Sequence, residues 1–418
     1  MKTIINRYIA LTIVPLLLLN LLAVAQEVEN PHVLKQYDFI YYENNTLNFY
    51  NDSSNFETLF GRLDDLIFEG KGKISVLQVG GSHIQADIWS DRIRQNFFKF
   101  SPGLNGGRGF LFPFTMAHTN NPYYYKVTYT GSWEGFRSSV KEHESEYGVS
   151  GITATTHDSL TSFQIAFRNK HCPKYDFNRV KVFHDLDSTG YKLAFVADSN
   201  HTVVVNEEIG YTEFLFDHYI DSVAFTITKT DTLQDHFNLY GLTLETDDPG
   251  IVYHAIGVNG ASTESYLRCN KFTQHLSALK PDLVIFCMGI NDAYHPDFSA
   301  KDYEHNYDTL VQWIRAVSPD AAIIFTTNND SYYKRRYPNR RAEQIRTVMI
   351  SLAKRHGAAV WDLYGVMGGL GSSRTWERNK LVKRDKIHFT RTGYRLVGDL
   401  MFSALVGAYD NHLKLAFE

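Results

Sequence analysis

Residues 76–85 read Val-Leu-Gln-Val-Gly-Gly-Ser-His-Ile-Gln, and the rest of the chain is organised around this stretch. Its apolar start is typical of a buried strand in a parallel sheet, and its glycine pair allows the sharp turn that ends such a strand. Apolar residues at helical spacing then predict a helix over 86–98. We therefore expect Ser82 at the carboxyl end of a strand and just before a helix, where open α/β sheets bind ligands.

An α/β pattern surrounds this stretch and resumes after residue 250. Upstream, an apolar stripe that starts after Ser53 and stops at Gly70 predicts a helix. Further strands are predicted at 252–256, 283–288, 321–326 and 359–363, and further helices at 263–277, 303–317, 342–356 and 392–409. Strands that alternate with helices form a mostly parallel sheet covered on both faces. The chain is therefore predicted to contain a three-layer, doubly wound α/β domain.

The pattern changes between the two α/β parts. Residues 101–114 hold six glycine or proline residues and are predicted to form a loop. Short alternating segments separated by turn residues follow over 115–248, which is typical of a β-sandwich or jelly roll. The predicted organisation is a signal peptide (1–25), an irregular N-terminal arm (26–53), the first part of the α/β domain (54–112), a β-rich inserted module (113–249) and the second part of the α/β domain (250–418).

The first 25 residues have the pattern of a secretory signal peptide. Lys2 and Arg7 form a positively charged start, and an apolar run follows over 9–22. Ala23-Val24-Ala25 then offers a small-x-small cleavage site. An uncleaved membrane anchor is the alternative, because the apolar run is near the lower length limit for crossing a bilayer. We expect cleavage after Ala25 and an exported protein, periplasmic or extracellular, with no stable membrane insertion.

The bulk composition argues against several classes of function. A formal net charge of −4 gives no sign of a nucleic-acid-binding surface. Three cysteines are too few for a disulfide framework or a zinc site; Cys287 is expected in the core, and pairing of Cys172 with Cys269 stays open. No Walker loop, dinucleotide fingerprint or His-Glu-x-x-His motif is present, so no metal or organic cofactor is expected.

Four short signals fall at the expected edge of one sheet, and together they supply the parts of an acyl-transfer site. Ser82 is the candidate nucleophile, His388 the base that takes its proton, and Asp385 the acid that orients the imidazole. The Ser82 N–H, the Gly260 N–H and the Asn291 side-chain amide are candidate donors to a developing oxyanion. A loop hydrogen-bond pair or half a metal site is the alternative for Asp385–His388, and a simple turn is the alternative for Asn291-Asp292.

These blocks resemble those of the SGNH hydrolases, also called the GDSL esterase/lipase family, which carry Ser, Gly, Asn and His in this chain order. The matching segments are 80–82, 257–260, 289–292 and 385–388. The family's first block usually has Asp before the serine, and here Gly81 occupies that place. The resemblance covers only the α/β half and implies a serine esterase with Ser82, Asp385 and His388 as its catalytic residues.

A narrower resemblance is to bacterial peptidoglycan O-acetylesterases, in which a β-rich, carbohydrate-binding-like module interrupts the hydrolase domain. The similar segments are Gly106–Phe110, Leu239–Leu242, Trp361–Tyr364 and Met367–Gly369 with Trp376. This resemblance implies an exported enzyme that removes acetyl groups from a glycan, without a metal or organic cofactor. The expected partner is an acetylated glycan substrate, with peptidoglycan first among the candidates.

Two further residues lie close to these blocks in the sequence, and three other functions stay open. His83, next to the nucleophile, and Arg108, in the glycine-rich loop, are weaker candidates for contact with substrate. Gly81 in place of the usual Asp motivates an alternative, a glycan-binding protein on an inactive hydrolase scaffold. A lipase or other carbohydrate acetylesterase, and acetyl transfer to a second sugar, use the same residues and stay open.

Overall fold

The computed structural model describes residues 34–51, 53–100, 102–168, 173–186, 190–196, 200–231 and 235–417. The predicted signal peptide, its cleavage site and Cys172 lie outside these residues. Residues 36–418 cluster as one unit. No helix in the described part of the chain combines the length and the apolar character that a bilayer crossing requires.

The central sheet has six strands in the order β14-β2-β15-β16-β19-β1. Their bounds are β1 Leu47–Phe49, β2 Lys73–Gly80, β14 Gly250–Gly257, β15 Leu283–Cys287, β16 Ala322–Thr326 and β19 Ala359–Trp361. All neighbours are parallel except β1, which pairs antiparallel with β19. The prediction of a mostly parallel sheet is confirmed, but the N-terminal arm is not wholly irregular, because it supplies the edge strand β1.

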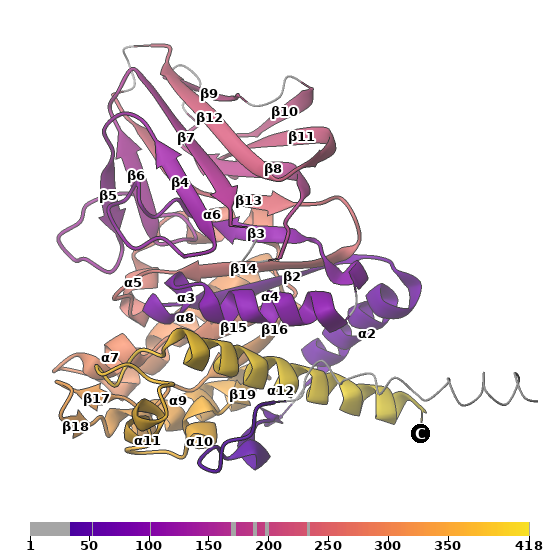
Figure 1. The fold of residues 1–418 in the computed structure, drawn as a ribbon, viewed down its shortest axis with the longest axis vertical. Helices are drawn as coiled ribbons and strands as arrows, with labels where there is room; N and C mark the ends of the chain where they lie inside the picture. The colour runs from indigo at the N-terminus through magenta and orange to yellow at the C-terminus, as the bar shows by residue number, and fades with distance from the viewer. Residues whose placement is uncertain are drawn as a thin grey trace, which may run out of the picture. The chain divides into compact units, whose positions relative to one another are not determined.

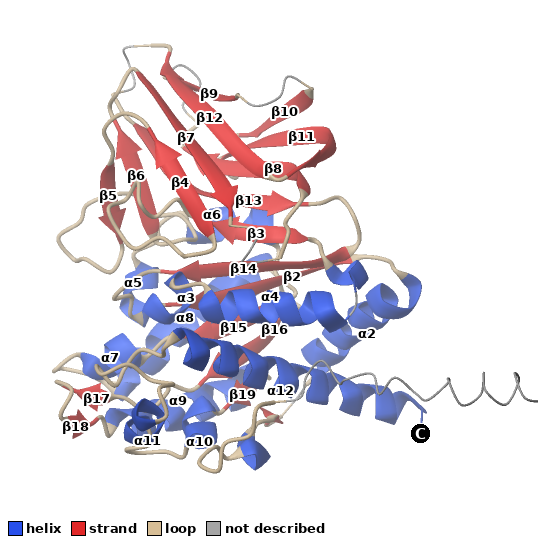
Figure 2. Cartoon of the chain, viewed as in Figure 1, coloured by secondary structure: helices blue, strands red, loops and turns tan. Residues whose placement is uncertain are grey.

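Helices cover both faces of this sheet (Figures 1 and 2). One layer holds α2 Ser54–Glu69, α4 Ile88–Phe100 and α12 Arg391–Phe417; the other holds α5 Thr263–Leu267, α6 Phe272–Leu279, α8 Ala300–Val317 and α9 Arg341–His356. Side chains of β2 alternate between the layers, so that Val76 faces the first layer and Leu77 joins the core of the second. The predicted three-layer α/β arrangement is confirmed.

Two of the predicted helices are interrupted. The one expected over 86–98 starts earlier, as the short helix α3 Ser82–Gln85, and is broken at Asp87, whose φ is +56°. The one expected over 263–277 splits into α5 and α6. Tyr147 explains this break: its N–H donates to Asn270 Oδ1 and its carbonyl accepts from the Lys271 N–H, both at 3.0 Å. A contact distant in sequence therefore overrides the local helical pattern.

Two antiparallel sheets occupy the region between β2 and β14 in the chain. The larger has the order β10-β11-β8-β13-β6-β5 with β3 also on β13, and the smaller has the order β4-β7-β12-β9. Their bounds are β3 Gly107–Leu111, β4 Tyr125–Tyr129, β5 Glu134–Arg137, β6 Ile152–Thr156, β7 Leu160–Phe167, β8 Phe177–His184, β9 Tyr191–Phe195, β10 His201–Asn206, β11 Tyr211–Ile220, β12 Ser222–Lys229 and β13 Phe237–Glu245.

The two sheets face each other through aromatic rings. Phe214 of β11 lies 5.2 Å from Phe225 of β12, and Phe195 of β9 lies 4.9 Å from Phe216 of β11, between ring centroids. This is sandwich packing, in which the inner faces of two sheets share a core. The jelly-roll topology and the module boundaries at 113 and 249 stay predictions.

The prediction that 101–114 is only a loop is wrong, because β3 is a buried strand within it. Its glycines serve close packing: a Cβ on Gly109, whose φ is +74°, would lie 2.6 Å from the Tyr253 carbonyl oxygen of β14. In Figure 1, β3 lies between the sandwich and β14 and so joins the two sheet systems. The remaining elements are η1 Tyr42–Asn44, η2 Pro102–Leu104, α7 Ile290–Tyr294, β17 Tyr332–Tyr333, β18 Tyr337–Pro338, α10 Leu363–Met367 and α11 Ser373–Arg378.

Candidate active site

The four sequence signals meet around one cavity of about 830 Å³ at the carboxyl edge of the central sheet. Ser82 follows β2, Gly260 follows β14, and Asn291 follows β15. His388 comes from the loop that precedes α12. Carboxyl ends of parallel strands share one edge, and this brings residues about 300 positions apart in the sequence into contact.

Ser82, His388 and Asp385 form a continuous chain of hydrogen bonds. Ser82 Oγ lies 2.8 Å from His388 Nε2, and His388 Nδ1 lies 2.9 Å from Asp385 Oδ2. The carboxylate fixes the proton on Nδ1 and leaves Nε2 as the acceptor of the serine proton. The structure thus brings the three predicted catalytic residues together, with His388 within hydrogen-bonding distance of both Ser82 and Asp385.

The loop around Asp385 is held by its own backbone. Asp385 Oδ1 accepts the N–H groups of Ile387 and His388, each at 2.9 Å, and Lys386 takes a φ of +58° to close this turn. Burial raises the pKa of Asp385, but hydrogen bonds from the His388 ring and from the two backbone N–H groups outweigh it and hold the pKa well below its usual range. Asp385 is therefore ionised at neutral pH.

The three candidate donors belong to residues that line the same cavity as Ser82 Oγ. The N–H groups of Ser82 and Gly260 have no acceptor within the described part of the chain. Asn291 Nδ2 donates to the Ala261 carbonyl at 2.8 Å, which orients the amide and leaves its second hydrogen for a ligand. Gly260 has a φ of +81°, which a residue with a Cβ adopts only under strain. Donors fixed in this way match an oxyanion hole.

Replacing Asn291 by alanine is expected to lower kcat by about 10²- to 10³-fold with little change in KM, because it removes one preorganised donor. Steady-state hydrolysis of a small chromogenic acetate measures both constants. Asn328→Ala is the matched control, since Asn328 is another amide lining the same cavity. An equal loss of kcat in both variants would contradict the specific role of Asn291.

Gly81 stands where the family pattern usually has Asp. A Cβ at this position would lie 3.2 Å from Asn291 Nδ2 and 3.4 Å from the Ala261 carbonyl oxygen. The hydrogen bond from Asn291 Nδ2 to the Ala261 carbonyl forms although residue 81 has no side chain. The position of the serine, the histidine and the amide donors therefore does not depend on a carboxylate at residue 81.

His83 lies behind the catalytic imidazole. Its Nδ1 is 2.9 Å from the Tyr394 hydroxyl, and its ring centroid is 5.3 Å from that of His388. Burial, followed by the charge of His388, lowers the pKa of His83 to about 3. His83 is therefore neutral at working pH and packs against His388, although it also lines the cavity.

The acid limb of the pH–rate profile is expected to stay in place when His83 is replaced by glutamine. Since His83 is protonated only near pH 3, it adds no titration between pH 5 and 8. Below its unfolded pKa of about 6.5 the unfolded chain binds a proton that the folded chain refuses, so His83 lowers stability as the pH falls. The pH–rate profiles of the wild type and the His83→Gln variant on a small acetate, measured from pH 4.5 to 8, test the expectation about the acid limb. A midpoint that moves by a full unit would show that His83 carries charge in this range.

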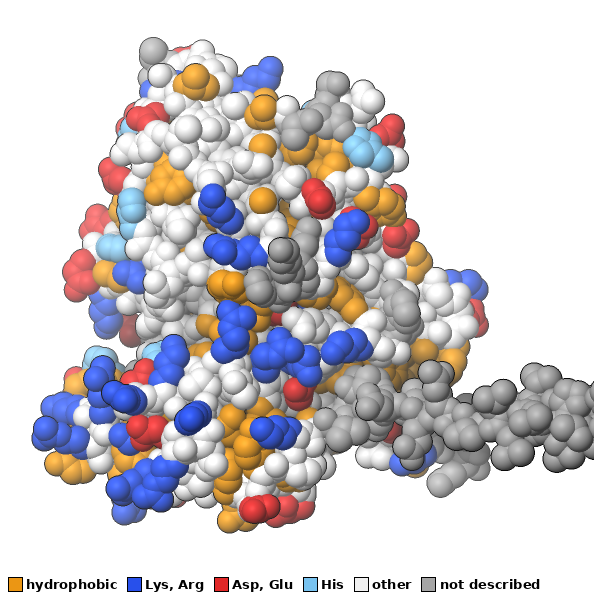
Figure 3. Space-filling view, in the orientation of Figure 1, with side chains coloured by type: hydrophobic (Ala, Val, Ile, Leu, Met, Phe, Trp, Pro, Cys, Tyr) orange, Lys and Arg blue, Asp and Glu red, His pale blue; other side chains and the backbone are white. Residues whose placement is uncertain are grey.

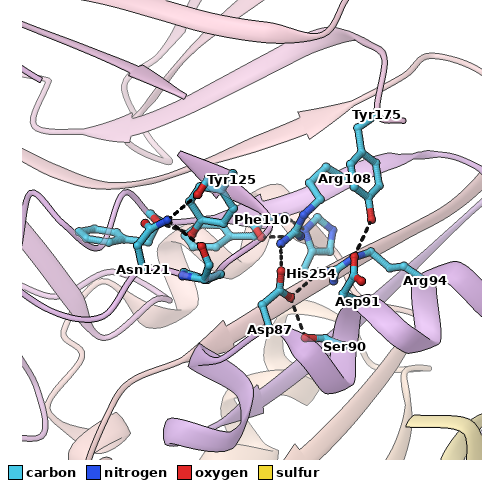
Figure 4. A network of polar contacts seen from close by, with 12 residues as sticks. Asp87, Ser90, Asp91, Arg94, Arg108, Phe110, Asn121, Tyr125, Tyr175 and His254 are labelled. Carbon is cyan, nitrogen blue, oxygen red and sulfur yellow. Dashed lines mark hydrogen bonds and ion pairs between the residues drawn. The ribbon is translucent and has the colours of Figure 1, made fainter. Parts of the chain in front are cut away.

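Arg108, predicted as a weaker candidate for contact with substrate, is buried and is not among the residues that line the cavity. It is 2% exposed and forms an ion pair with Asp87, which also pairs with Arg94 (Figure 4). Burial raises the pKa of Asp87, but the charges of Arg108 and Arg94 outweigh it and lower the pKa overall. Asp87 sits in the turn between α3 and α4, so this network fastens β3 to the helix that begins at Ser82.

Gln85 makes contacts near the active site that the sequence did not predict. It lies on α3, three residues after Ser82, and is buried. Its Oε1 accepts the Asn259 N–H at 2.6 Å, and its Nε2 donates to the Asn120 carbonyl at 2.9 Å. Gln85 therefore joins the nucleophile helix, the Gly260 loop and the segment that precedes β4.

Further cavity residues come from segments that carried no motif in the sequence. The segment before β4 contributes Asn120, Asn121, Pro122 and Tyr123, and the segments that flank His388 contribute Lys383 and Arg391. Cys287, expected in the core, lies at the cavity wall, and burial raises its pKa to about 12, so it is an inert thiol. Among the described residues, no group of three His, Cys, Asp or Glu side chains is arranged to hold a metal ion.

A nucleophilic serine, its imidazole base, a carboxylate and fixed amide donors define the class of serine hydrolases. Residues 230–396 match the model of the GDSL-like lipase/acylhydrolase family. The match contains three of the four blocks, and Ser82 precedes it because the sandwich separates the first block from the others. Residues 230–396 therefore form a GDSL-like lipase/acylhydrolase domain, whose class of reaction is carboxylic ester hydrolysis.

Several solved structures are similar to this chain, and the first of those described here shares its fold. One described as a peptidoglycan O-acetylesterase in action is 21% identical, with a TM-score of 0.70 over 87% of this chain and 99% of that chain. A lipase/acylhydrolase from Enterococcus faecalis is 25% identical over 39% of this chain and 78% of that chain, with a TM-score of 0.31. An acetyl xylan esterase, AlAXEase, is 21% identical over 38% and 83%, with a TM-score of 0.30. A search of curated protein sequences gives no significant match.

Proposed function

We propose that the protein is an exported serine esterase that removes O-acetyl groups from a polysaccharide, with peptidoglycan as the first candidate. The observation that carries the proposal is the 2.8 Å contact between Ser82 Oγ and His388 Nε2 beside free amide donors. Export rests on the signal-peptide pattern of residues 1–25.

The proposed reaction has two halves. Ser82 Oγ attacks the acetyl carbonyl while His388 Nε2 takes the hydroxyl proton, and the amide donors hold the oxyanion. The sugar alkoxide leaves with the proton from His388, and an acetyl ester remains on Ser82. Water then attacks this ester, His388 again takes and returns a proton, and acetate is released. Asp385 holds the imidazole and stabilises its charged form in both halves.

The choice of a glycan acetate over a long acyl chain rests on the cavity wall. Eight asparagine and threonine residues lie among its lining residues: Asn120, Asn121, Asn259, Asn291, Thr326, Thr327, Asn328 and Asn329. Such groups suit sugar hydroxyls, whereas a long acyl chain needs a continuous apolar slot. The solved structure described as a peptidoglycan O-acetylesterase in action has the same fold, and this supports peptidoglycan as the first substrate to test.

Acetate release tests the proposal. Purified protein is incubated with O-acetylated peptidoglycan, acetylated xylan and a long-chain ester, and the liberated acid is measured. We expect acetate from an acetylated glycan and little release from the long-chain ester. A clear preference for long acyl chains would instead make the protein a lipase.

Gly81 favours a second candidate, a glycan-binding protein without turnover. Under this alternative the protein would retain acetylated glycan but would neither release acetate nor react with a fluorophosphonate probe. Labelling of the wild-type protein at Ser82, read by mass spectrometry, separates the two candidates.

A further inference from the structure

The wall of the catalytic cavity carries positive charge and no carboxylate, although the chain as a whole has a net charge of −4. Lys383 and Arg391 line the cavity, and both are exposed. No Asp or Glu occurs among its described lining residues, and no carboxylate of the described chain lies within 4 Å of either cation. A cavity of this kind attracts an anion.

The two cations flank the catalytic loop. Lys383 lies two residues before Asp385, and its N–H donates to the His388 carbonyl at 2.7 Å. Arg391 lies three residues after His388, as the first residue of α12. Any ligand group that these side chains bind therefore lies close to the reacting ester.

Arg391 is held from the sandwich side by an aromatic ring. Its guanidinium lies 4.4 Å from the ring centroid of Tyr123, which is 40% exposed and lines the same cavity. A second guanidinium, that of Arg168, lies 5.0 Å from the centroid of the same Tyr123 ring. The stack fixes the guanidinium while its N–H edge stays available for bidentate binding of a carboxylate.

The position of Arg391 is electrostatically unfavourable for the fold. It begins a helix of 27 residues, and a cation at a helix N-terminus is repelled by the helix dipole. A merely structural choice at this place would be a neutral or acidic side chain. Figure 3 shows Lys and Arg side chains in a band over α4 and the start of α12, which extends the positive field beyond the cavity.

We propose that Lys383, Arg391 and Tyr123 form a subsite that binds a carboxylate carried by the acetylated polymer, so that the preferred substrate is an anionic glycan. This inference rests on the proposed function, because it assigns the substrate class of the same site. Arg391 holds the carboxylate, Lys383 adds a second charge, and the Tyr123 ring holds the Arg391 guanidinium in place.

The experiment compares an acetylated polymer that bears carboxylates, acetylated pectin, with a neutral one, acetylated xylan. In the Lys383→Gln/Arg391→Gln variant, kcat/KM is expected to fall about 10- to 100-fold more on acetylated pectin than on acetylated xylan. In the wild type, 0.5 M NaCl is expected to weaken only the reaction on pectin. The matched control is Lys301→Gln/Arg340→Gln, which removes two exposed cations outside the cavity and is expected to behave as the wild type.

Equal losses on both polymers would overturn the subsite, because they would mean that Arg391 only fastens the sandwich to α12. Binding is also measured without turnover, by affinity electrophoresis of Ser82→Ala protein in de-acetylated polygalacturonate. Retardation that disappears when Lys383 and Arg391 are replaced supports the subsite even if the wild type releases no acetate from any polymer. Lack of acetate release from every polymer would contradict the proposed function alone. Absence of retardation would contradict the subsite alone.

Discussion

Ser82→Ala is expected to lower kcat on a small acetate by about 10⁴- to 10⁶-fold, the range found when the serine of a hydrolytic triad is removed. The reason is that the group positioned to attack the carbonyl is lost. Ser82 Oγ is the atom in contact with His388 Nε2, whereas His83 is buried, neutral and bonded to Tyr394. KM should change little, because the amide donors and the cavity wall remain.

The measurement pairs kinetics with covalent labelling. Wild-type protein should react with a fluorophosphonate probe at Ser82, and the alanine variant should not. The free energy of unfolding should change by no more than about 1 kcal/mol, since the hydroxyl faces the cavity and makes one hydrogen bond. Full activity in the variant would remove Ser82 from the mechanism. Lost activity with a large loss of stability would mean that the assay reports unfolding.

The site could be predicted from the sequence where its residues follow strand ends. Ser82, Gly260 and Asn291 each come directly after an apolar run, and parallel strands bring such positions to one edge of the sheet whatever their separation in sequence. Asp385 and His388 follow no strand, and only their three-residue spacing and the resemblance to a known family pointed to them. The hydrogen bonds within that loop show why the spacing works.

The failures have a common physical cause, which is contact between distant segments. The glycines around Arg108 read as a loop, but they allow β3 to pack against the backbone of β14, and the arginine is then buried with Asp87. Gln85 and Tyr123 carry no local signal, because their roles arise only when the segment before β4 reaches the cavity. Spacing within one segment does not encode such an approach.

Asp385→Asn is expected to lower kcat by about 10⁴-fold while the fold is retained. In the variant, the side-chain oxygen can still accept the N–H groups of Ile387 and His388, which bond Asp385 Oδ1 at 2.9 Å. The new NH₂ group then faces His388 Nδ1, which must become an acceptor. The imidazole proton moves to Nε2, and the atom beside Ser82 Oγ can no longer take the serine proton.

Stability and pH separate this tautomer argument from general damage to the site. Because the pKa of Asp385 is held below its usual range, the carboxylate stabilises the fold at pH values above about 3.9 and loses this contribution as the pH falls through its folded pKa. Asp385→Asn should therefore be less stable than the wild type at pH 7, and the gap should narrow in acid. Asp385→Ala, which imposes no wrong tautomer, should retain more activity than Asp385→Asn. If the alanine variant were the slower of the two, the carboxylate would act through its charge and not through the orientation of the His388 proton.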